Sequence, residues 1–182
     1  MDNGASSYRR FLDGDESAFD EIMKELFHGL VFFINGLVHD VHTAEDLAID
    51  TFSDLIVHRH RYNFKVSLKT YLYMIGRSRT LDYIKHRDRF AFVELSQVQE
   101  QADDQLTLEQ IVLKDARKRA VHRALAQLPG EMAAAVHLIY FEDLSYEEAA
   151  RVLKKNRKQV DNLLYRAKKE LRIILGEDGE QV

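Results

Sequence analysis

The chain has 182 residues and a mass of 21.2 kDa, with 46% hydrophobic and 31% charged residues, which suits one ordinary domain or two small ones. It contains no cysteine, which excludes disulfides, thiolate metal sites and cysteine nucleophiles. A single proline and eight glycines leave too few turn residues for a many-stranded sandwich or barrel, so an all-α fold is expected. The net charge of −4 does not by itself indicate nucleic acid as a partner.

Neither export nor membrane insertion is expected. The first residues, MDNGASSYRRF, hold no apolar stretch after their charges. The most apolar segment, Leu26 to Val38, is interrupted by His28 and Asn35 and is shorter than the roughly 18 residues of a membrane span. We therefore expect a cytoplasmic protein and interpret this segment as a buried core helix.

Three helices are predicted in the first half of the chain. Apolar residues three and four positions apart predict a core helix from Ser17 to Val38. Thr43 followed by Asp46 matches a capping box that would open the next helix. After a loop over residues 60–66, Ser67 can cap a third helix. On that helix we expect Leu68, Leu72 and Ile75 inward and Tyr71, Tyr73, Arg77 and Lys85 outward.

A second helical unit is predicted after an acidic linker. We place the first unit at residues 1–90, the linker at 91–105, the second unit at 106–176 and a tail at 177–182. Helices are predicted near Glu131 to Phe141, Tyr146 to Leu153 and Arg157 to Leu175. Ser145 with Glu148 forms a capping box, and Asn156 with Gln159 forms its asparagine variant. The short connection between the last two helices has the spacing of a helix-turn-helix.

Charge is distributed unevenly along the chain. Residues 61–89 hold eight basic and two acidic side chains, a net charge of +6, and residues 151–172 hold nine basic and two acidic, a net charge of +7. Residues 94–115 between them hold six acids and one lysine. Solvated helix faces are the alternative interpretation of such blocks. Two basic segments separated by an acidic linker favour nucleic-acid binding.

The two basic segments differ in chemistry. The last helix is expected to present cations together with hydrogen-bonding side chains, as a recognition helix in a major groove must. Its expected outward residues are Lys158, Asp161, Asn162, Tyr165, Arg166, Lys168 and Lys169. The first segment interleaves its cations with Tyr62, Phe64, Tyr71, Tyr73 and Tyr83, which suits an opened single strand. The alternative is that some of these rings, Tyr71 or Tyr83 above all, belong to the core.

The motifs resemble those of extracytoplasmic-function bacterial sigma factors. The resemblance rests on AEDLAIDTF (44–52), SLKTYLYMIGRSRTLDYIKHR (67–87), LAQLP, LIYFEDLSYEEAARVL and VDNLLYRAKKELR, in that order, and spans about residues 16–172. It implies two small helical domains, a region 2-like bundle and a region 4-like helix-turn-helix, joined by the acidic linker. It also implies a promoter-specificity subunit of RNA polymerase that has no cofactor and is held in check by an anti-sigma factor.

The resemblance also assigns roles to residues. Docking on the clamp helices of the largest polymerase subunit falls on Asp46, Ile49, Asp50 and Phe52. Recognition and melting of the −10 promoter element fall on Tyr62, Asn63, Phe64, Lys65, Ser67, Tyr73, Arg77, Ser78 and Arg79. Recognition of the −35 element falls on Arg157, Lys158, Asp161, Asn162, Tyr165 and Arg166. The acidic linker would occupy the active-site and RNA-exit channels of the polymerase.

The chain departs from the family pattern at several positions. Ile49 and Asp50 stand where glutamine and glutamate are usual, and Ser78 stands where asparagine is usual. The turn of the helix-turn-helix has Lys154 and Lys155 where a glycine and an aliphatic residue are usual. Asp161 also departs, because a basic residue is common at that position; a carboxylate there can accept from a cytosine amino group.

Two other classes of protein are compatible with parts of this sequence. A stand-alone helix-turn-helix regulator with an N-terminal dimerisation or sensing domain is the main alternative, and a small helical enzyme is a more distant one. No glycine-rich phosphate loop, carboxylate pocket or nucleophile triad is present in the sequence. No metal site is expected either, because the closely spaced histidines His39 and His42, and His58 and His60, lie in a loop or point to different sides of a helix.

Overall fold

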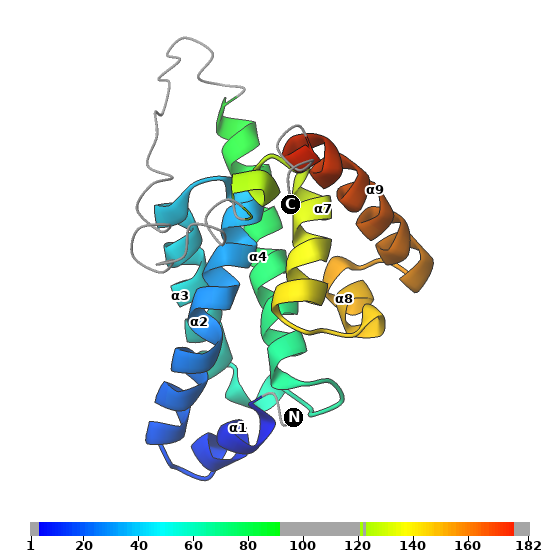
Figure 1. Cartoon of the computed structure of the whole chain (residues 1–182). Helices are drawn as coiled ribbons and strands as arrows, with labels where there is room; N and C mark the ends of the chain where they lie inside the picture. Colours follow the sequence, from blue (N-terminus) through cyan, green and yellow to red (C-terminus); the bar gives the residue numbers. More distant parts are fainter. Residues whose placement is uncertain (1–3, 92–120, 122, 177–182) are drawn as a thin grey trace.

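The structure, a computed structural model, describes residues 4–91, 121 and 123–176, and these residues form helices and turns without a β-strand (Figure 1). The N-terminal helical unit comprises α1 (Ala5–Leu12), α2 (Ser17–Val38), α3 (Val41–Val57), the short 3-10 helix η1 (Arg59–Arg61) and α4 (Leu68–Ala91). The C-terminal helical unit comprises α7 (Gly130–Val136), the π-helical segment η2 (His137–Phe141), α8 (Tyr146–Leu153) and α9 (Arg157–Gly176). The all-α expectation is confirmed. Residues 92–105 of the predicted linker, residues 106–120 of the predicted second unit and the predicted tail lie outside the described residues.

Helix α2 is the centre of the N-terminal unit. Its apolar stripe buries Ile22, Leu26, Leu30 and Ile34 against α1, α3 and α4, as its 3.6-residue period predicts. The helix spans Ser17–Val38, the range that the sequence predicts. It ends at His39, which takes a left-handed conformation with φ 56°.

The start of α3 differs from the prediction. The side chain of Asp40 accepts a 2.6 Å hydrogen bond from the Thr43 backbone N–H and caps a helix that begins at Val41. This bond lowers the pKa of the Asp40 carboxyl. The predicted capping box between Thr43 and Asp46 is therefore wrong by one turn, because an aspartate three residues earlier supplies the cap.

Helix α1 was not expected from the sequence. Its Tyr8 is fully buried, and the Tyr8 hydroxyl donates to the backbone oxygens of Leu55 (3.1 Å) and Arg59 (3.0 Å). The Tyr8 ring also meets the Tyr62 ring edge-on, with centroids 5.5 Å apart. Helix α1 therefore braces the segment that joins α3 to α4.

The joints of the C-terminal unit match the sequence closely. Ser145 and Glu148 form a complete capping box at the start of α8. Asn156 and Gln159 exchange reciprocal bonds of 2.8 and 2.9 Å at the start of α9. Lys154 ends α8 in a left-handed conformation with φ 53°, where glycine is the usual residue. The turn thus keeps its geometry despite the lysine, which carries the strain of a side chain at positive φ.

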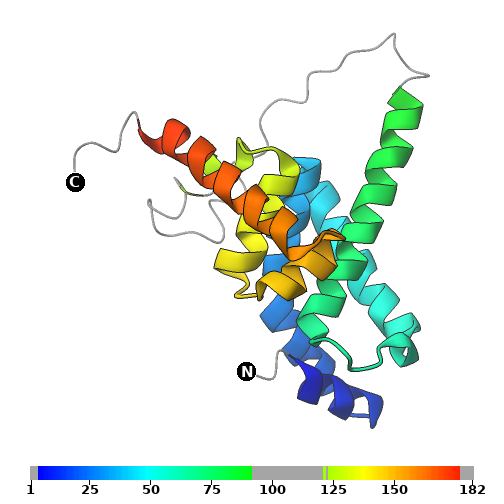
Figure 2. The same ribbon diagram turned by 90° about the vertical axis from the view of Figure 1, so that its right-hand side faces the viewer.

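The two units pack directly on each other and share one continuous hydrophobic core. In Figure 1, α7 and α8 lie alongside α2 and α4. Gly36 of α2 faces Ala133 of α7 so closely that a Cβ on Gly36 would lie 3.9 Å from the Ala133 Cβ. Figure 2 shows α9 on the outside of the molecule and the end of α4 projecting beyond its neighbours. Within the described residues, no helix has the length and apolar character that crossing a membrane requires.

Candidate nucleic-acid interface

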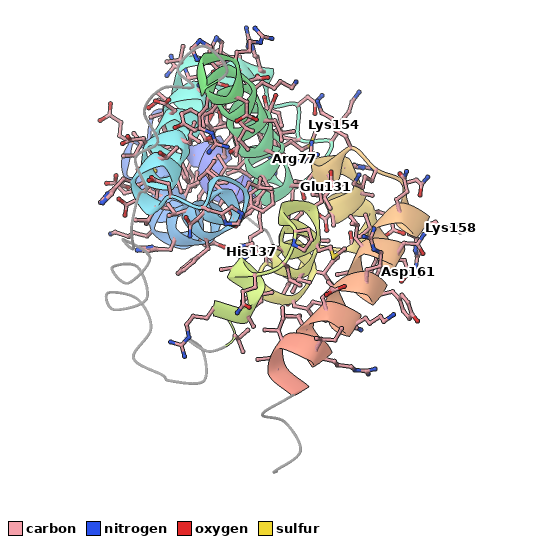
Figure 3. The ribbon with its side chains drawn as sticks, turned by 90° about the horizontal axis from the view of Figure 1, so that it is seen from above. Arg77, Glu131, His137, Lys154, Lys158 and Asp161 are labelled. Carbon is pink, nitrogen blue, oxygen red and sulfur yellow. The ribbon has the colours of Figure 1, made fainter. Side chains whose placement is uncertain are left out.

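The outer face of α9 carries all six residues predicted for the −35 element. Its inner face is buried through Val160, Leu163, Leu164 and Ala167. The exposed residues are Arg157, Lys158, Asp161, Asn162, Tyr165 and Arg166. They follow one another at helical spacing, so they form a single strip of cations, an amide, a phenol and a carboxylate. Figure 3 shows Lys158 and Asp161 on the side of α9 that points away from the other helices.

The first turn of α9 is organised by α8. The Arg157 guanidinium pairs with Glu147 at 2.9 Å and lies over the Tyr146 ring at 5.7 Å. Tyr146, Arg157, Lys158 and Asp161 line an open groove at this point. Both charges of the Arg157–Glu147 pair are well exposed, so the pair orients the arginine with little effect on stability. The carboxylate of Asp161 therefore shares this groove with the cations of Arg157 and Lys158.

The predicted docking residues of α3 divide between surface and core. Asp46, Ile49 and Asp50 are exposed, and 51% of Ile49 is accessible. Phe52 is only 2% accessible and packs between Phe19 and Phe27. Its assignment as a polymerase contact is therefore corrected: in this structure Phe52 is a core residue that holds α3 on α2.

The exposed face of α3 extends further than the sequence predicted. Ile56 and Val57 are both exposed at the end of the helix. Together with Ile49 they give this face an apolar character beside its two carboxylates. Their exposure was detectable as a departure from the period of the buried residues Leu47, Thr51 and Leu55.

The segment between α3 and α4 is ordered by its own aromatic rings. Tyr62 is buried and donates to the Val66 backbone oxygen at 2.6 Å, and its ring packs against the Phe64 ring at a tilt, with centroids 4.5 Å apart. Phe64 takes a positive φ of 60° and lies under the Arg9 guanidinium at 4.8 Å. The prediction that Tyr62 contacts DNA is therefore corrected: in this structure Tyr62 is a core residue of the loop. Asn63 and Lys65 remain on the surface.

Basic residues that the role assignment had missed flank this loop. Arg59, His60 and Arg61 of η1 are exposed, and they extend the cationic surface that Lys65 continues. The signal was present in the sequence as the run HRHR at residues 58–61.

The predicted −10 residues of α4 are partly covered by the C-terminal unit. Tyr73 is completely buried, so its expected outward position is wrong. The side chain of Arg77 is only 11% accessible and lies 3.6 Å from Glu131. Ser67 caps α4 through a 3.1 Å bond to the Thr70 N–H, as predicted. Ser78 is exposed, whereas Arg79 pairs with Asp54 of α3 at 2.9 Å.

A buried polar cluster lies beneath this contact. Glu142 pairs with Lys69 of α4 at 3.1 Å and with His137 at 3.2 Å, and His137 also bonds the Gly29 backbone oxygen of α2 at 3.0 Å. Burial alone would raise the pKa of Glu142, but the hydrogen bond and charge of His137, joined by Lys69, lower it. The carboxylate is therefore held in its charged form by its two partners.

Gly29 and Tyr73 shape the floor of that cluster. Any Cβ at Gly29 would overlap the Glu142 carboxylate and lie 2.7 Å from the Tyr73 hydroxyl. Burial and the neighbouring Glu142 charge raise the pKa of Tyr73 well above its ordinary value. The hydroxyl lies beside that carboxylate but has no partner of full hydrogen-bond geometry among the described residues. The glycine thus permits a close approach between the two units that no other residue would allow.

These features define the class of the molecule: an all-helical protein whose C-terminal unit is a helix-turn-helix with a polar, cationic outer face. Comparison with known families is specific. The model for Sigma-70 region 2 matches residues 22–90, and the model for Sigma-70, region 4 matches residues 118–171. The two matches fall on the two halves of the chain.

Relatives and solved structures agree with those matches. The ECF RNA polymerase sigma factor SigM of Bacillus subtilis is 24% identical over 161 residues, which is 85% of this chain and 93% of that protein. The ECF RNA polymerase sigma factor SigE of Mycolicibacterium smegmatis is 28% identical over 176 residues, which is 92% of this chain and 66% of that protein.

In fold, the chain is similar to the sigma factor RpoE of Bartonella quintana, solved with the anti-sigma factor NepR. The TM-score is 0.73 at 21% identity, over 87% of this chain and 96% of that one. It is also similar to CnrH, solved with the cytosolic domain of CnrY. Here the TM-score is 0.64 at 20% identity, over 97% of each chain.

The chain belongs to the extracytoplasmic-function sigma factors. It is a sigma subunit of RNA polymerase that acts in promoter recognition and transcription initiation.

Proposed function

We propose that this chain divides promoter recognition between two faces and docks on polymerase through a third. The outer face of α9 reads the −35 element, the loop before α4 together with α4 binds and opens the −10 element, and the exposed face of α3 binds the clamp helices of the largest polymerase subunit. In this proposal, residues 1–90 form the domain that binds polymerase and the −10 element, and residues 106–176 form the domain that binds the −35 element. The observation that carries the proposal is the strip of six exposed polar and charged side chains on α9.

The α9 strip contains residues of two kinds, which a binding experiment can separate. Arg166 carries a charge suited to a phosphate, and Asn162 carries an amide suited to a base edge. Arg166→Ala should weaken binding to all −35 variants and reduce the salt slope by about one. Asn162→Ala should relax preference at one base pair, at a cost of about 1–3 kcal/mol.

The measurement is fluorescence anisotropy of holoenzyme on duplexes varied singly across the −35 element. Glu170→Ala is the matched control, because Glu170 is exposed on the same helix but lies outside the proposed set. An Asn162→Ala loss that is equal for every base-pair variant would show that Asn162 is not a base reader.

Docking on polymerase is proposed for Asp46, Ile49 and Asp50. Replacing Asp46 and Asp50 with lysine should abolish co-purification with core polymerase. Both carboxylates are exposed on α3, and lysines in their place would repel a cationic partner surface. The control replaces Asp20 and Glu25, exposed acids of α2, with lysine. Circular dichroism checks that helicity is kept. Undiminished co-purification of the α3 variant would remove this assignment.

Strand opening is proposed for the exposed side chains of the α3–α4 loop. Asn63 offers an amide and Lys65 a cation, and the Lys65 backbone N–H donates a 3.1 Å hydrogen bond to the Asn63 side-chain oxygen, which orients the amide. An extruded base loses a few kcal/mol of stacking and pairing, so this loop must offset that loss.

The double variant Asn63→Ala with Lys65→Ala should keep core binding but lose open complexes on duplex promoters. A template already unpaired at −10 should recover part of the activity. Permanganate reactivity of thymines measures the opening, and full reactivity in the variant would show that another element opens the strands.

We further infer that the chain works in the cytoplasm, beside its polymerase, and that catalysis belongs to the polymerase and not to this subunit. An anti-sigma partner is also proposed, and the support is that one of the two similar structures was solved with an anti-sigma factor. Purifying the tagged chain before and after induction, and identifying the protein that leaves it, tests this partner. A chain that is monomeric and without a bound protein under both conditions would argue against it.

A further inference from the structure

We propose that Arg9 of α1 is a further DNA-binding residue of this chain: its guanidinium and the Phe64 ring form the two faces between which one unpaired base of the −10 element stacks. The inference rests on the proposed role of the α3–α4 loop in binding and opening that element. No motif of the sequence assigns a role to Arg9, which lies in a helix that the sequence did not predict.

The Phe64 ring lies at the edge of a cluster of aromatic side chains. It packs against the rings of Tyr62 and Tyr8, with centroids 4.5 and 6.4 Å away. Those two rings are buried, whereas Phe64 is only partly buried. The bond from the Tyr62 hydroxyl to the Val66 backbone oxygen closes the loop around Phe64. The cluster thus holds one aromatic ring at the surface of the loop, as a platform for base stacking requires.

The backbone holds Phe64 in a conformation that residues with a side chain rarely adopt. Its φ of 60° lies in the left-handed region, which is unfavourable for any residue that carries a Cβ. Residues held in this way are concentrated at binding sites and active sites, where the surrounding structure fixes them. The backbone conformation therefore favours a functional role for the ring that it presents.

The two arginines at the end of α1 have different surroundings. The Arg9 guanidinium lies over the Phe64 ring, 4.8 Å from the ring centroid. The Arg10 guanidinium is bound by two carboxylates, Asp15 at 2.6 Å and Glu21 at 3.0 Å. Among the residues that the structure describes, no carboxylate pairs with Arg9. Arg9 is also exposed, so its side chain can move without breaking an ion pair.

The helix that carries Arg9 is fixed at two points. The Tyr8 hydroxyl bonds two backbone oxygens, one near the end of α3 and one in η1. At the start of α1, Gly4 lies against Leu68 of α4, where an added Cβ would be 3.1 Å from the leucine side chain. Figures 1 and 2 both show α1 beside the loop that joins α3 to α4. The Arg9 backbone therefore stays in place while its side chain moves.

This arrangement matches what an extruded base needs. A base that leaves the duplex loses its stacking, and bases stack both on aromatic rings and on the guanidinium plane of arginine. A base between the two groups requires roughly 7 Å from ring to guanidinium, which is two stacking distances of about 3.4 Å. The present distance is 4.8 Å, so the Arg9 guanidinium must move outward by about 2 Å. Arg9 therefore covers the Phe64 ring in the free chain and holds a base against it in the open complex.

Two substitutions at position 9 separate stacking from charge. Arg9→Lys keeps the positive charge but loses the planar group, so a residue that stacks on a base should lose binding in Arg9→Lys as in Arg9→Ala. Phe64→Leu removes the ring and keeps an apolar side chain. Arg10→Ala is the matched control, because it removes an exposed arginine of the same turn that binds carboxylates instead of the ring. Thermal unfolding verifies that all variants are folded.

The readout is binding of holoenzyme to a fluorescent single strand that carries the −10 sequence selected by the wild-type holoenzyme. The bases of this strand are removed one at a time to leave abasic sites. One abasic position should weaken wild-type binding by at least about fivefold, the low end of what stacking of one base contributes.

The variants should couple to that one position. Arg9→Ala, Arg9→Lys and Phe64→Leu should each weaken binding of the intact strand and reduce the effect of that abasic position, because the base then has no complete stacking site to lose. The effects of the other abasic positions should stay the same. Arg10→Ala should bind every strand as the wild type does.

Four results would overturn the inference. Wild-type affinity in Arg9→Ala, or an equal loss in Arg10→Ala, would remove the special role of Arg9. A loss that is equal for the intact strand and for every abasic strand would show that Arg9 only supports the loop. Full affinity in Arg9→Lys with weak binding by Arg9→Ala would show that Arg9 contacts a phosphate and not a base. In these cases the proposed −10 function stands; it fails, and the inference with it, if the wild-type holoenzyme selects no −10 sequence.

Discussion

Removing the Tyr8 hydroxyl tests the brace between α1 and the loop before α4. Tyr8→Phe keeps the ring contacts but deletes one donor that two backbone oxygens share, those of Leu55 and Arg59. Because the site is fully buried, water cannot replace the lost bond without local opening. We expect the free energy of unfolding to fall by about 1–2 kcal/mol at neutral pH.

The same variant has a signature at high pH. Burial raises the pKa of Tyr8 to about 12, whereas the unfolded chain titrates near 10. The unfolded state therefore loses its proton first, and stability falls as pH rises between these values. A shift of two units corresponds to about 2–3 kcal/mol, and this part of the pH dependence should disappear in Tyr8→Phe.

Urea denaturation followed by circular dichroism at neutral pH and across pH 9–11.5 measures both effects. Tyr165→Phe is the control, because Tyr165 is 73% accessible and its hydroxyl should contribute little to stability. A Tyr8→Phe loss no larger than that of the control, with an unchanged alkaline slope, would refute the brace. Open-complex formation then provides a second readout, since a looser loop should melt promoters less efficiently.

Three further predictions concern the core, the turn and acid stability. Phe52→Ala should lower the free energy of unfolding by about 3–5 kcal/mol, whereas Ile49→Ala should change it by less than about 0.5 kcal/mol yet weaken retention on immobilised core polymerase. Lys154→Gly should raise the urea midpoint, by about 0.5–1 kcal/mol in stability, because it relieves a left-handed side-chain conformation. The pKa values of Glu142 and Glu148 are both lowered. Their charged forms should therefore contribute to the free energy of unfolding at neutral pH, and this contribution should be lost as the pH drops through their folded pKa values. In thermal scans, Glu142→Gln should make the fall in stability at acid pH less steep.

Local signals predicted the local structure of this chain well. The span of α2 and the capped joints of α8 and α9 follow from periodicity and short-range hydrogen bonds, which involve residues within one turn of each other. The start of α3 could not be predicted from local signals, because Asp40 and Thr43 offer competing caps and only the folded chain shows which one is used.

Burial that depends on distant segments could not be predicted. The period of α4 placed Tyr73 outside, and within the N-terminal unit alone that placement is reasonable. In the folded chain, Tyr73 is covered by Glu142 and its neighbours from the C-terminal unit. The prediction for Phe52 was wrong for a different reason. A motif associated with docking contains both surface and core positions, and the Phe52 side chain faces Phe19 and Phe27.

The most direct test of the central claim is transcription with purified components. Sigma-free core polymerase is mixed with this chain and with a promoter template chosen by in vitro selection, and the run-off product is measured for the wild type and for the Asp46/Asp50 and Asn162 variants. The account predicts a promoter-dependent product with the wild type, none with the docking variant, and a product with altered −35 preference for Asn162→Ala. Equal products from all three proteins, or no promoter-dependent product although the wild type binds core polymerase, would contradict it.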